Sequence, residues 1–202
     1  MTRICLVRHG ETDWNAAKRI QGRTDIPLNK IGKWQAEQTG LYLKDFHWDV
    51  VISSPLSRAK ETANLILKYV HAPLVIMDDF IERDYGDAEG MSLEERQELF
   101  PDKQYPNMES LKSLQDRMLK GIHKVRAAYP DQNVLIIAHG AAIHALLSVL
   151  ADEHIDLHHA RLVNACLNYV EWKDGEWKVR DYNVVSHLTQ SSPSLHRDLK
   201  SL

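Results

Sequence analysis

The sequence predicts an α/β fold: a three-layer α/β/α arrangement with a mostly parallel central sheet and a C-terminal antiparallel hairpin. The main observation is that short apolar runs of strand length alternate with longer segments in which apolar residues recur every three or four positions. Strands that alternate with helices favour parallel pairing, with helices on both faces of the sheet. A second observation is the run Asn-Val-Leu-Ile-Ile-Ala at residues 133–138, which is typical of a strand buried on both faces.

Three strands and two helices are predicted in the N-terminal part of the chain. The strands lie at residues 4–7, 50–52 and 74–76, where short apolar runs occur. The first helix begins after Asn29, a residue suited to cap it, and the second has Pro55 in its first turn. Apolar residues recur at helical spacing in both helices: Ile31, Trp34 and Leu41 in the first, and Leu56, Ala59, Ala63, Ile66 and Val70 in the second.

The C-terminal part continues the alternation and ends in a hairpin. Beyond the third strand the spacing predicts two helices, the longer at about 109–129, then the strand at 133–138 and a helix at 141–150. Two late strands, at about 165–172 and 177–184, flank the turn sequence Lys-Asp-Gly-Glu. This turn predicts that the last two strands pair antiparallel.

The chain is predicted to form a single domain at residues 1–190, because no linker and no internal repeat interrupts it. The remaining segment, 191–202, begins with Ser-Ser-Pro-Ser, so we expect it to be a flexible tail.

Composition excludes some classes of partner. The chain has 202 residues and a net charge of −3, so no overall basic field would attract nucleic acid or an acidic membrane surface. The two cysteines lie in apolar, strand-like segments and are expected to be buried free thiols. The N-terminal apolar run is too short for a signal peptide, and no later run reaches the length of a membrane span. We therefore expect a cytoplasmic protein, and its oligomeric state is not predicted.

Residues that can perform chemistry follow the predicted strands. Two strands end in a histidine followed by glycine, at His9 and His139, and Arg8 precedes the first of them. Arg58 lies early in the helix after the second strand, and Glu82 follows the third strand. Because ligands bind beyond the carboxyl ends of strands in such sheets, these side chains are expected to meet at one edge.

This set of residue types is suited to phosphoryl transfer. A guanidinium can bind two phosphoryl oxygens at once, and a neutral imidazole can attack phosphorus and form a covalent intermediate. A carboxylic acid can protonate the leaving oxygen and later accept a proton from water. Glycines after the histidines allow the backbone to approach the anion, and helix N-termini after Gly10, Ser54 and Gly140 would add partial positive charge. Two arginines and a protonated histidine would supply the positive charge that a metal ion provides elsewhere, so no metal and no cofactor is expected.

A second histidine cluster has a simpler explanation than metal binding. His154 and His158 are four residues apart and could face a metal together from one helix, with His159 beside them. Acidic neighbours and the absence of a zincin-type glutamate favour a solvated polar segment instead.

Several sequence blocks resemble the signature of the histidine phosphatase superfamily, the phosphoglycerate-mutase-like proteins. The blocks occur in the family's order and extend over about residues 3–185. The N-terminal blocks are Leu6-Val7-Arg8-His9-Gly10-Glu11-Thr12-Asp13-Trp14-Asn15, Gln21-Gly22 and Ser53-Ser54-Pro55-Leu56-Ser57-Arg58-Ala59. The later blocks are Glu82-Arg83-Asp84-Tyr85-Gly86, Glu89-Gly90 and Ala138-His139-Gly140.

The resemblance implies a role for each matching residue. His9 would be the nucleophile that becomes phosphorylated, and Arg8, Arg58 and His139 would hold the phosphoryl oxygens, His139 as a cation or as a hydrogen-bond donor. Glu82 would be the general acid and then the general base. The residues expected to bind the phosphate or the rest of the substrate are Asn15, Gln21, Gly22 and Gly140, with Arg83 and Tyr85 at the entrance.

The resemblance favours a metal-independent phosphatase of the broad-specificity branch that acts on a small phosphorylated metabolite. Phosphoglycerate mutases of the family carry a lysine where this chain has Leu93, although Tyr85 resembles mutases. The segment Met108-Glu109-Ser110 departs from the Gly-Glu-Ser of many relatives, which leaves the substrate group open. The alternatives are a cofactor-dependent mutase and a phosphoprotein-binding pseudoenzyme. Specificity is expected from residues 100–110, Arg23, Arg83 and Tyr85.

Overall fold

The computed structural model describes residues 1–151 and 161–189 of the chain. The histidine cluster at His154, His158 and His159 and the predicted tail at 191–202 lie outside the described residues.

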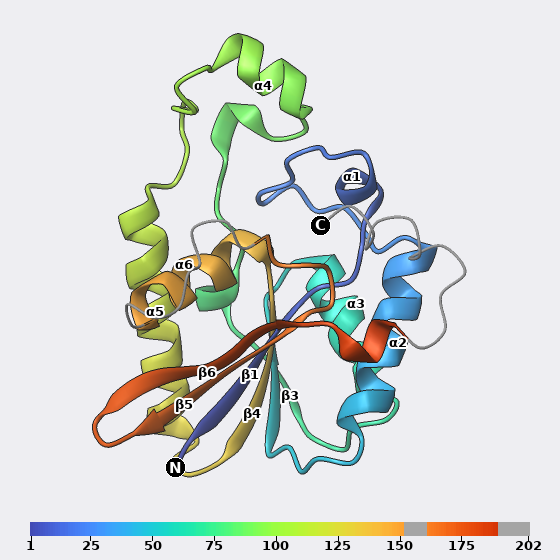
Figure 1. The fold of residues 1–202 in the computed structure, drawn as a ribbon, viewed down its shortest axis with the longest axis vertical. Coiled ribbons are helices and arrows are strands. Elements are labelled where there is room, and N and C mark those ends of the chain that lie inside the picture. Colours follow the sequence, from blue (N-terminus) through green and yellow to red (C-terminus); the bar gives the residue numbers. More distant parts are fainter. Residues whose placement is uncertain (152–160, 190–202) are drawn as a thin grey trace.

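The described residues form a six-stranded sheet that is mostly parallel, as the sequence predicts (Figure 1). The strand order is β3-β2-β4-β1-β5-β6, in which β1 to β4 are parallel and β5 is antiparallel to both β1 and β6. The strands are β1 (Arg3–Arg8), β2 (Val50–Ser53), β3 (Leu74–Ile76), β4 (Asn133–Ala138), β5 (Leu167–Lys173) and β6 (Glu176–Val184). The predicted C-terminal hairpin is confirmed as β5 and β6.

Helices cover both faces of this sheet, which gives the predicted three layers (Figure 1). α2 and α3 pack on one face, and α5 and α6 pack on the other. The helices are α1 (Asp13–Ala16), α2 (Lys30–Leu43), α3 (Ser57–Ile66), α4 (Leu93–Leu99), α5 (Leu111–Ala128) and α6 (Gly140–Leu150). Short 3-10 turns lie at η1 (Asp78–Phe80), η2 (Gly86–Ala88) and η3 (Ser186–Leu188).

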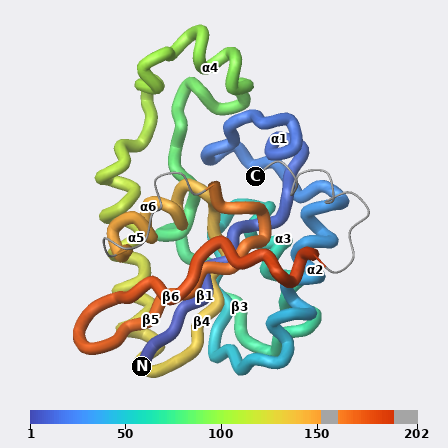
Figure 2. Tube along the Cα trace, viewed as in Figure 1, coloured from blue at the N-terminus to red at the C-terminus, as the bar shows by residue number. Residues whose placement is uncertain are grey.

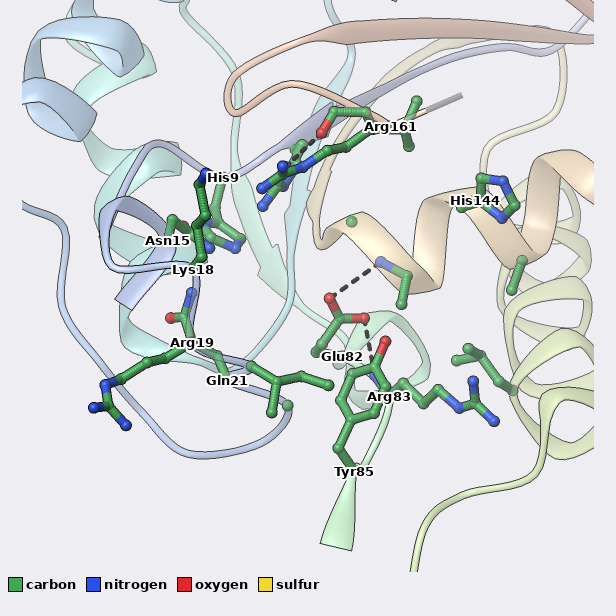
Figure 3. Close-up of a pocket in the computed structure, with 18 of the residues that line it drawn as sticks. His9, Asn15, Lys18, Arg19, Gln21, Glu82, Arg83, Tyr85, His144 and Arg161 are labelled. Atoms are coloured by element: carbon green, nitrogen blue, oxygen red, sulfur yellow. Dashed lines mark hydrogen bonds between the residues drawn. The ribbon is translucent and has the colours of Figure 1, made fainter. Parts of the chain in front are cut away.

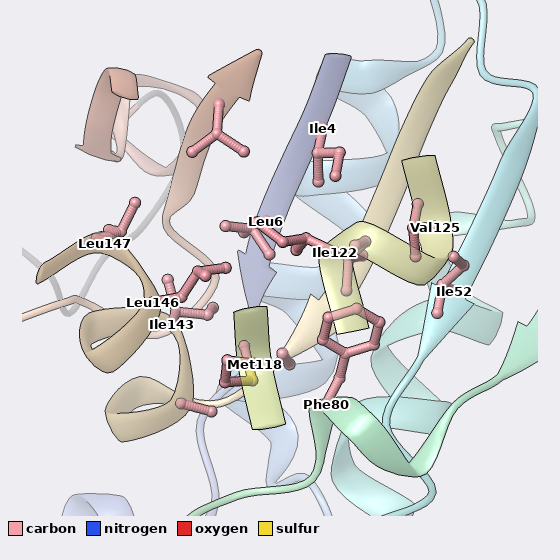
Figure 4. Close-up of a cluster of buried hydrophobic side chains, with 14 of the residues drawn as sticks. Ile4, Leu6, Ile52, Phe80, Met118, Ile122, Val125, Ile143, Leu146 and Leu147 are labelled. Carbon is pink, nitrogen blue, oxygen red and sulfur yellow. The ribbon is translucent and has the colours of Figure 1, made fainter. Parts of the chain in front are cut away.

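Alternate residues of the central strands supply two separate hydrophobic clusters. On β1, Ile4 and Leu6 face the cluster beneath α5 and α6, and Cys5 and Val7 face the cluster beneath α3. Figure 4 shows the first cluster, where Met118 and Ile122 of α5 and Ile143 of α6 meet the strand side chains. These strands are buried on both faces, so their middle residues are apolar and the strands read as continuous apolar runs rather than alternating ones.

The first long helix forms where predicted but packs through a different face. Asn29 caps α2, since its side chain accepts a hydrogen bond from Gly32 N at 2.8 Å. However, Ile31 and Leu41 are exposed, and apart from Gln35 and Leu43 the buried residues of α2 are small. A Cβ on Gly40 would lie 3.0 Å from Ile66 Cα, so the two helices approach at backbone distance. Close helix contacts of this kind carry no apolar signal in the sequence.

The start of α3 was predicted two residues too early. The helix begins at Ser57 rather than at Pro55, and its N-cap position, Leu56, provides no side-chain hydrogen bond. Asp25 takes that role from another part of the chain, because its carboxylate accepts from Ser57 N at 2.8 Å and from Ser57 Oγ at 2.7 Å. The cap that fixes this helix is therefore distant in sequence.

The carboxyl ends of β1, β2 and β4 meet at one edge of the sheet. These strands end at Arg8, Ser53 and Ala138, so His9 and His139 follow two neighbouring central strands. The chain between η2 and α5, which carries α4, extends away from the sheet beyond this edge (Figures 1 and 2). Among the described residues, no helix is long and apolar enough to cross a membrane.

Candidate active site

A cavity of about 560 Å³ opens at this edge of the sheet. Its wall contains all the predicted site residues except His139 (Figure 3): Arg8, His9, Asn15, Gln21, Gly22, Arg58, Glu82, Arg83, Tyr85 and Gly140. His139 lies directly behind the wall, and its ring centroid is 5.1 Å from that of His9. The structure therefore brings the predicted set together around one cavity.

His9 is held as a neutral imidazole with one defined tautomer. It is 2% exposed, and its Nδ1 donates to the carbonyl oxygen of Gly10 at 2.6 Å. The proton on Nδ1 leaves Nε2 with a lone pair, which faces Arg58 Nε at 3.3 Å. Burial lowers the pKa of His9 well below its usual range, and the charges of Arg58 and Arg8 lower it further. An unprotonated nitrogen is what a nucleophile requires.

His139 is also buried and neutral, which argues against the predicted cationic form. Its Nε2 is 2.6 Å from Ser54 Oγ, and within the described chain its Nδ1 has no hydrogen-bond partner. Burial is the largest cause that lowers the pKa of His139, followed by the charge of Arg58. The alternative prediction, a hydrogen-bond donor, is compatible with the unpartnered nitrogen.

Arg58 connects the nucleophile to the loop at residues 22–24. Its side chain is 1% exposed, and its terminal nitrogens donate to the carbonyl oxygens of Gly22 at 2.7 Å and Thr24 at 2.9 Å. Each terminal nitrogen keeps a second N–H for another acceptor. Burial lowers the pKa of Arg58, but an arginine remains charged in proteins.

Arg8 is placed against the start of α6. One terminal nitrogen donates to the carbonyl oxygen of Leu162, and its buried Nε has no partner within the described residues. A Cβ on Gly140 would lie 3.2 Å from this Nε, so glycine at that position lets the guanidinium approach the helix. An N–H donor left free beside the cavity is suited to bind an anion.

The carboxylate of Glu82 occupies the N-terminus of α6. Its Oε1 accepts from Arg83 N at 2.9 Å and its Oε2 accepts from Ala141 N at 3.2 Å (Figure 3). Oε1 also accepts from Ala142 N at 2.9 Å. The prediction that helix N-termini after Gly10, Ser54 and Gly140 point at the phosphate is therefore only partly met. α6 alone starts at the predicted residue, and its first free N–H groups are taken by Glu82.

Gly22 and Asn15 are fixed by neighbours that the sequence did not indicate. Gly22 has φ +57°, and a Cβ there would lie 1.9 Å from Glu89 Oε1, so only glycine fits. The side-chain oxygen of Asn15 accepts from Asn164 Nδ2 at 3.1 Å, which leaves its amide N–H groups for other partners. Asn164 also donates to the carbonyl oxygen of His9 at 3.1 Å, so it links both residues.

The outer wall of the cavity holds cations that sequence reasoning missed. Besides Arg19, which pairs with Glu95 at 3.4 Å, they are Lys18, Arg96 and Arg161, together with the predicted Arg83. In the part of the chain that the structure describes, none of the four forms an ion pair with a carboxylate. Arg96 is oriented by Tyr105, since its Nη1 donates to the hydroxyl at 3.3 Å.

The residues expected to determine specificity differ in their positions relative to the cavity, since Arg83 and Tyr85 line it and others do not. Arg23 is outside the wall and forms ion pairs with Asp84 at 3.5 Å and Glu109 at 3.6 Å. The segment 100–110 contributes no wall residue and acts instead through Tyr105, which holds Arg96. A lone helical arginine such as Arg96 looks like a solvated side chain in the sequence, so no signal was available to find it.

We expect the unliganded protein to lose stability as the pH falls below about 6.5. The pKa values of His9, His139 and His187 are all lowered in the folded state, chiefly by burial. In this pH range the unfolded chain binds more protons, so stability rises with pH and is lost on acidification, by up to about 1.4 kcal/mol per pH unit and histidine. Urea unfolding between pH 7 and 5.5 measures the slope. His9→Ala should make the dependence of the unfolding free energy on pH shallower. An unchanged slope would contradict a lowered pKa of His9 in the folded state.

Comparison with known proteins gives consistent results over the length of the chain. The family model described as histidine phosphatase superfamily (branch 1) matches residues 4–185. The uncharacterized phosphatase PhoE of Bacillus subtilis is 58% identical, with 94% of this chain and 98% of PhoE covered. The metal-independent phosphoserine phosphatase of Arabidopsis thaliana is 34% identical, with 94% and 84% covered. A probable phosphoglycerate mutase, GpmB, of Proteus mirabilis is 32% identical, with 94% and 96% covered.

Solved structures share the architecture. The structure of YhfR from Bacillus stearothermophilus superposes with a TM-score of 0.85 at 25% identity, covering 93% of this chain and all of that one.

Proposed function

This chain belongs to the histidine phosphatase superfamily, branch 1, and we propose that it is a metal-independent phosphomonoesterase that acts through a phosphohistidine intermediate. The observation that carries the proposal is the state of His9. Its Nδ1 proton is engaged by Gly10 and its Nε2 lone pair lies in the cavity wall beside Arg58, as an in-line attack on phosphorus requires.

In the first step, Nε2 of His9 forms a bond to phosphorus while the ester bond to the leaving oxygen breaks. Arg8 and Arg58 offer free N–H groups to the phosphoryl oxygens, and His139 donates from Nδ1 in its neutral form. The guanidinium charges supply the stabilisation that a metal ion provides in other phosphoryl-transfer sites. The relative named metal-independent supports this assignment.

Glu82 is proposed as the proton carrier of both steps. It donates a proton to the leaving oxygen in the first step and accepts one from the attacking water in the second. Its carboxylate lines the same cavity as His9 and is held by three backbone N–H groups, which support a fixed position.

The substrate is proposed to be a small phosphorylated metabolite that carries a second anionic group. Arg8 and Arg58 would bind the phosphoryl group, and Lys18, Arg96 and Arg161 add positive charge to the same cavity that no carboxylate of the described residues pairs with. Phosphoserine, named for one relative, has a carboxylate and fits this distribution of charge. Asn15, Gln21 and Gly22 line the inner part of the cavity, and Arg83 and Tyr85 line the outer part, with the guanidinium 5.5 Å from the ring centre.

A phosphoglycerate mutase is the second candidate. The relative named as a probable mutase and the extra cations of the outer wall both favour it. Leu93 lines the cavity at a position where mutases of the family carry lysine, which counts against the mutase.

We expect hydrolysis of p-nitrophenyl phosphate and of phosphoserine that resists excess EDTA. The reason is that arginine side chains rather than a metal ion stabilise the charge that develops on phosphate. Phosphate release and conversion of 3-phosphoglycerate to 2-phosphoglycerate would be measured in parallel. Mutase turnover well above hydrolysis would replace the proposal with the second candidate, and loss of hydrolysis in EDTA would contradict the metal-independent mechanism.

A further inference from the structure

The backbone that carries Glu82 belongs to no strand or α-helix. It follows η1, which ends at Phe80, and runs in an irregular conformation to η2. Such a segment has no ladder of its own hydrogen bonds, so its position depends on the partners that its carbonyl groups find elsewhere.

Arg117 of α5 supplies most of these partners. Its Nη1 donates to the carbonyl oxygens of Asp79 at 2.9 Å and Ile81 at 2.8 Å, and its Nη2 is 3.4 Å from that of Glu82. Three carbonyl groups of one short segment therefore converge on a single guanidinium. The side chain is 20% exposed and lies outside the wall of the cavity.

Glu109 orients this guanidinium. The carboxylate binds it through two bonds, from Nε at 3.1 Å and from Nη2 at 2.9 Å, and is itself only 10% exposed. A two-bond pair fixes the plane of a guanidinium, so Arg117 cannot rotate away from the carbonyl groups without losing its counterion.

The two ends of Glu82 are thus attached to different helices. Arg117 binds its backbone to α5, and the N–H groups of Ala141 and Ala142 bind its carboxylate to α6. If the α5 attachment were lost, the carboxylate would still be drawn to α6, and the backbone would settle in a new position. A displacement of about 1 Å is enough to lower a rate by two orders of magnitude.

From these contacts we infer that Arg117 is a positioning residue that fixes Glu82 for proton transfer to the leaving oxygen, with Glu109 as its orienting partner. The inference rests on the acid role of Glu82 in the proposed function. It gives Arg117 an effect on catalysis although the side chain has no place in the cavity wall.

The dependence of the rate on the leaving group distinguishes a residue that positions Glu82 from one that only stabilises the fold. An ester with a poor leaving group, such as phosphoserine, needs the acid, whereas p-nitrophenyl phosphate depends on it far less. Arg117→Lys keeps the positive charge beside Glu109 but cannot reach three carbonyl groups. We expect its kcat/KM, which reports the first step and not the hydrolysis of the phosphoenzyme common to both esters, to fall at least about tenfold more on phosphoserine than on p-nitrophenyl phosphate, in the same direction as Glu82→Gln.

Lys124 provides the matched control. It lies on the same helix and binds the same segment through the carboxylate of Asp79, at 2.7 and 3.0 Å, without contacting the carbonyl groups. Lys124→Ala should lower Tm slightly and leave the ratio of the two kcat/KM values unchanged. Glu109→Gln is the second positioning variant, should Arg117→Lys fold poorly, and should move the ratio in the same direction.

Each contrary result has a distinct meaning. Equal losses on both esters in Arg117→Lys and Glu109→Gln, with Glu82→Gln still selective, would overturn the inference and leave the proposed function intact. The same change of ratio in Lys124→Ala would also overturn it, because any loosening of the segment would then suffice. If Glu82→Gln itself affects both esters equally, the acid role fails, and the inference fails with it.

Discussion

His9→Ala should abolish turnover and phosphoenzyme formation while the protein stays folded. Removing a covalent nucleophile from a site that acts as a unit lowers kcat by about 10⁴- to 10⁶-fold. The variant also removes an imidazole that is buried in a neutral form between two guanidinium groups, so the loss of activity should not come from unfolding. Rapid-quench labelling with ³²P-substrate would measure the acid-labile phosphoenzyme directly, beside steady-state phosphate release.

His47→Ala is the control for this variant. The imidazole of His47 is exposed and pairs with Asp49 at 3.1 Å, away from the cavity wall. It should retain wild-type turnover and labelling. Phosphoenzyme that forms at a normal rate in His9→Ala would assign the nucleophile to another residue.

Arg58→Lys should lower kcat by about 10²- to 10³-fold although the charge is retained. One planar guanidinium holds the carbonyl groups of Gly22 and Thr24 and faces Nε2 of His9, and an ammonium cannot occupy all three directions. The substitution leaves at least one buried acceptor unsatisfied, which costs about 1–3 kcal/mol of folding free energy. Single-turnover kinetics and urea unfolding would measure the two effects separately.

Arg126→Lys serves as the comparison for that substitution. The guanidinium of Arg126 lies 4.0 Å from the ring centre of Trp172 and outside the cavity wall. It should change stability without changing the single-turnover rate. A single-turnover rate for Arg58→Lys within threefold of wild type would mean that positive charge alone, rather than the planar guanidinium with its fixed N–H groups, binds the phosphoryl group.

The sheet and the inner site were predictable because both follow from local rules. Strand length, helical spacing and the rule that ligands bind beyond strand ends are sufficient to bring His9, Arg58, Glu82 and His139 to one edge. The resemblance of the surrounding blocks to a known family then suggested a role for each. Those roles remain proposals, and the structure supplies the tautomer of His9 and the neutral state of His139, which no sequence pattern carries.

What the sequence did not predict depends on contacts between distant segments. Asp25 caps α3 from 32 positions away, and α2 approaches α3 at Gly40 while Ile31 and Leu41 stay exposed. Arg96 and Arg117 are ordinary helical arginines until the fold places one in the cavity wall and the other on three carbonyl groups. Neither spacing nor composition records such tertiary bonds.

The order of the strands also divides the protein into regions of unequal local stability. β1 and β4, which lead to His9 and His139, are inner strands of the sheet, so their amide protons should exchange only when the whole domain opens. α4 extends beyond the edge of the sheet (Figure 2), so we expect its amide protons to exchange through local opening. Under the proposed function, the residues that perform the chemistry and the α4 residues that line the cavity then lie in separate cooperative units. We therefore expect that substitutions in α4 can change which ester is hydrolysed without lowering the stability of the strands that carry His9 and His139.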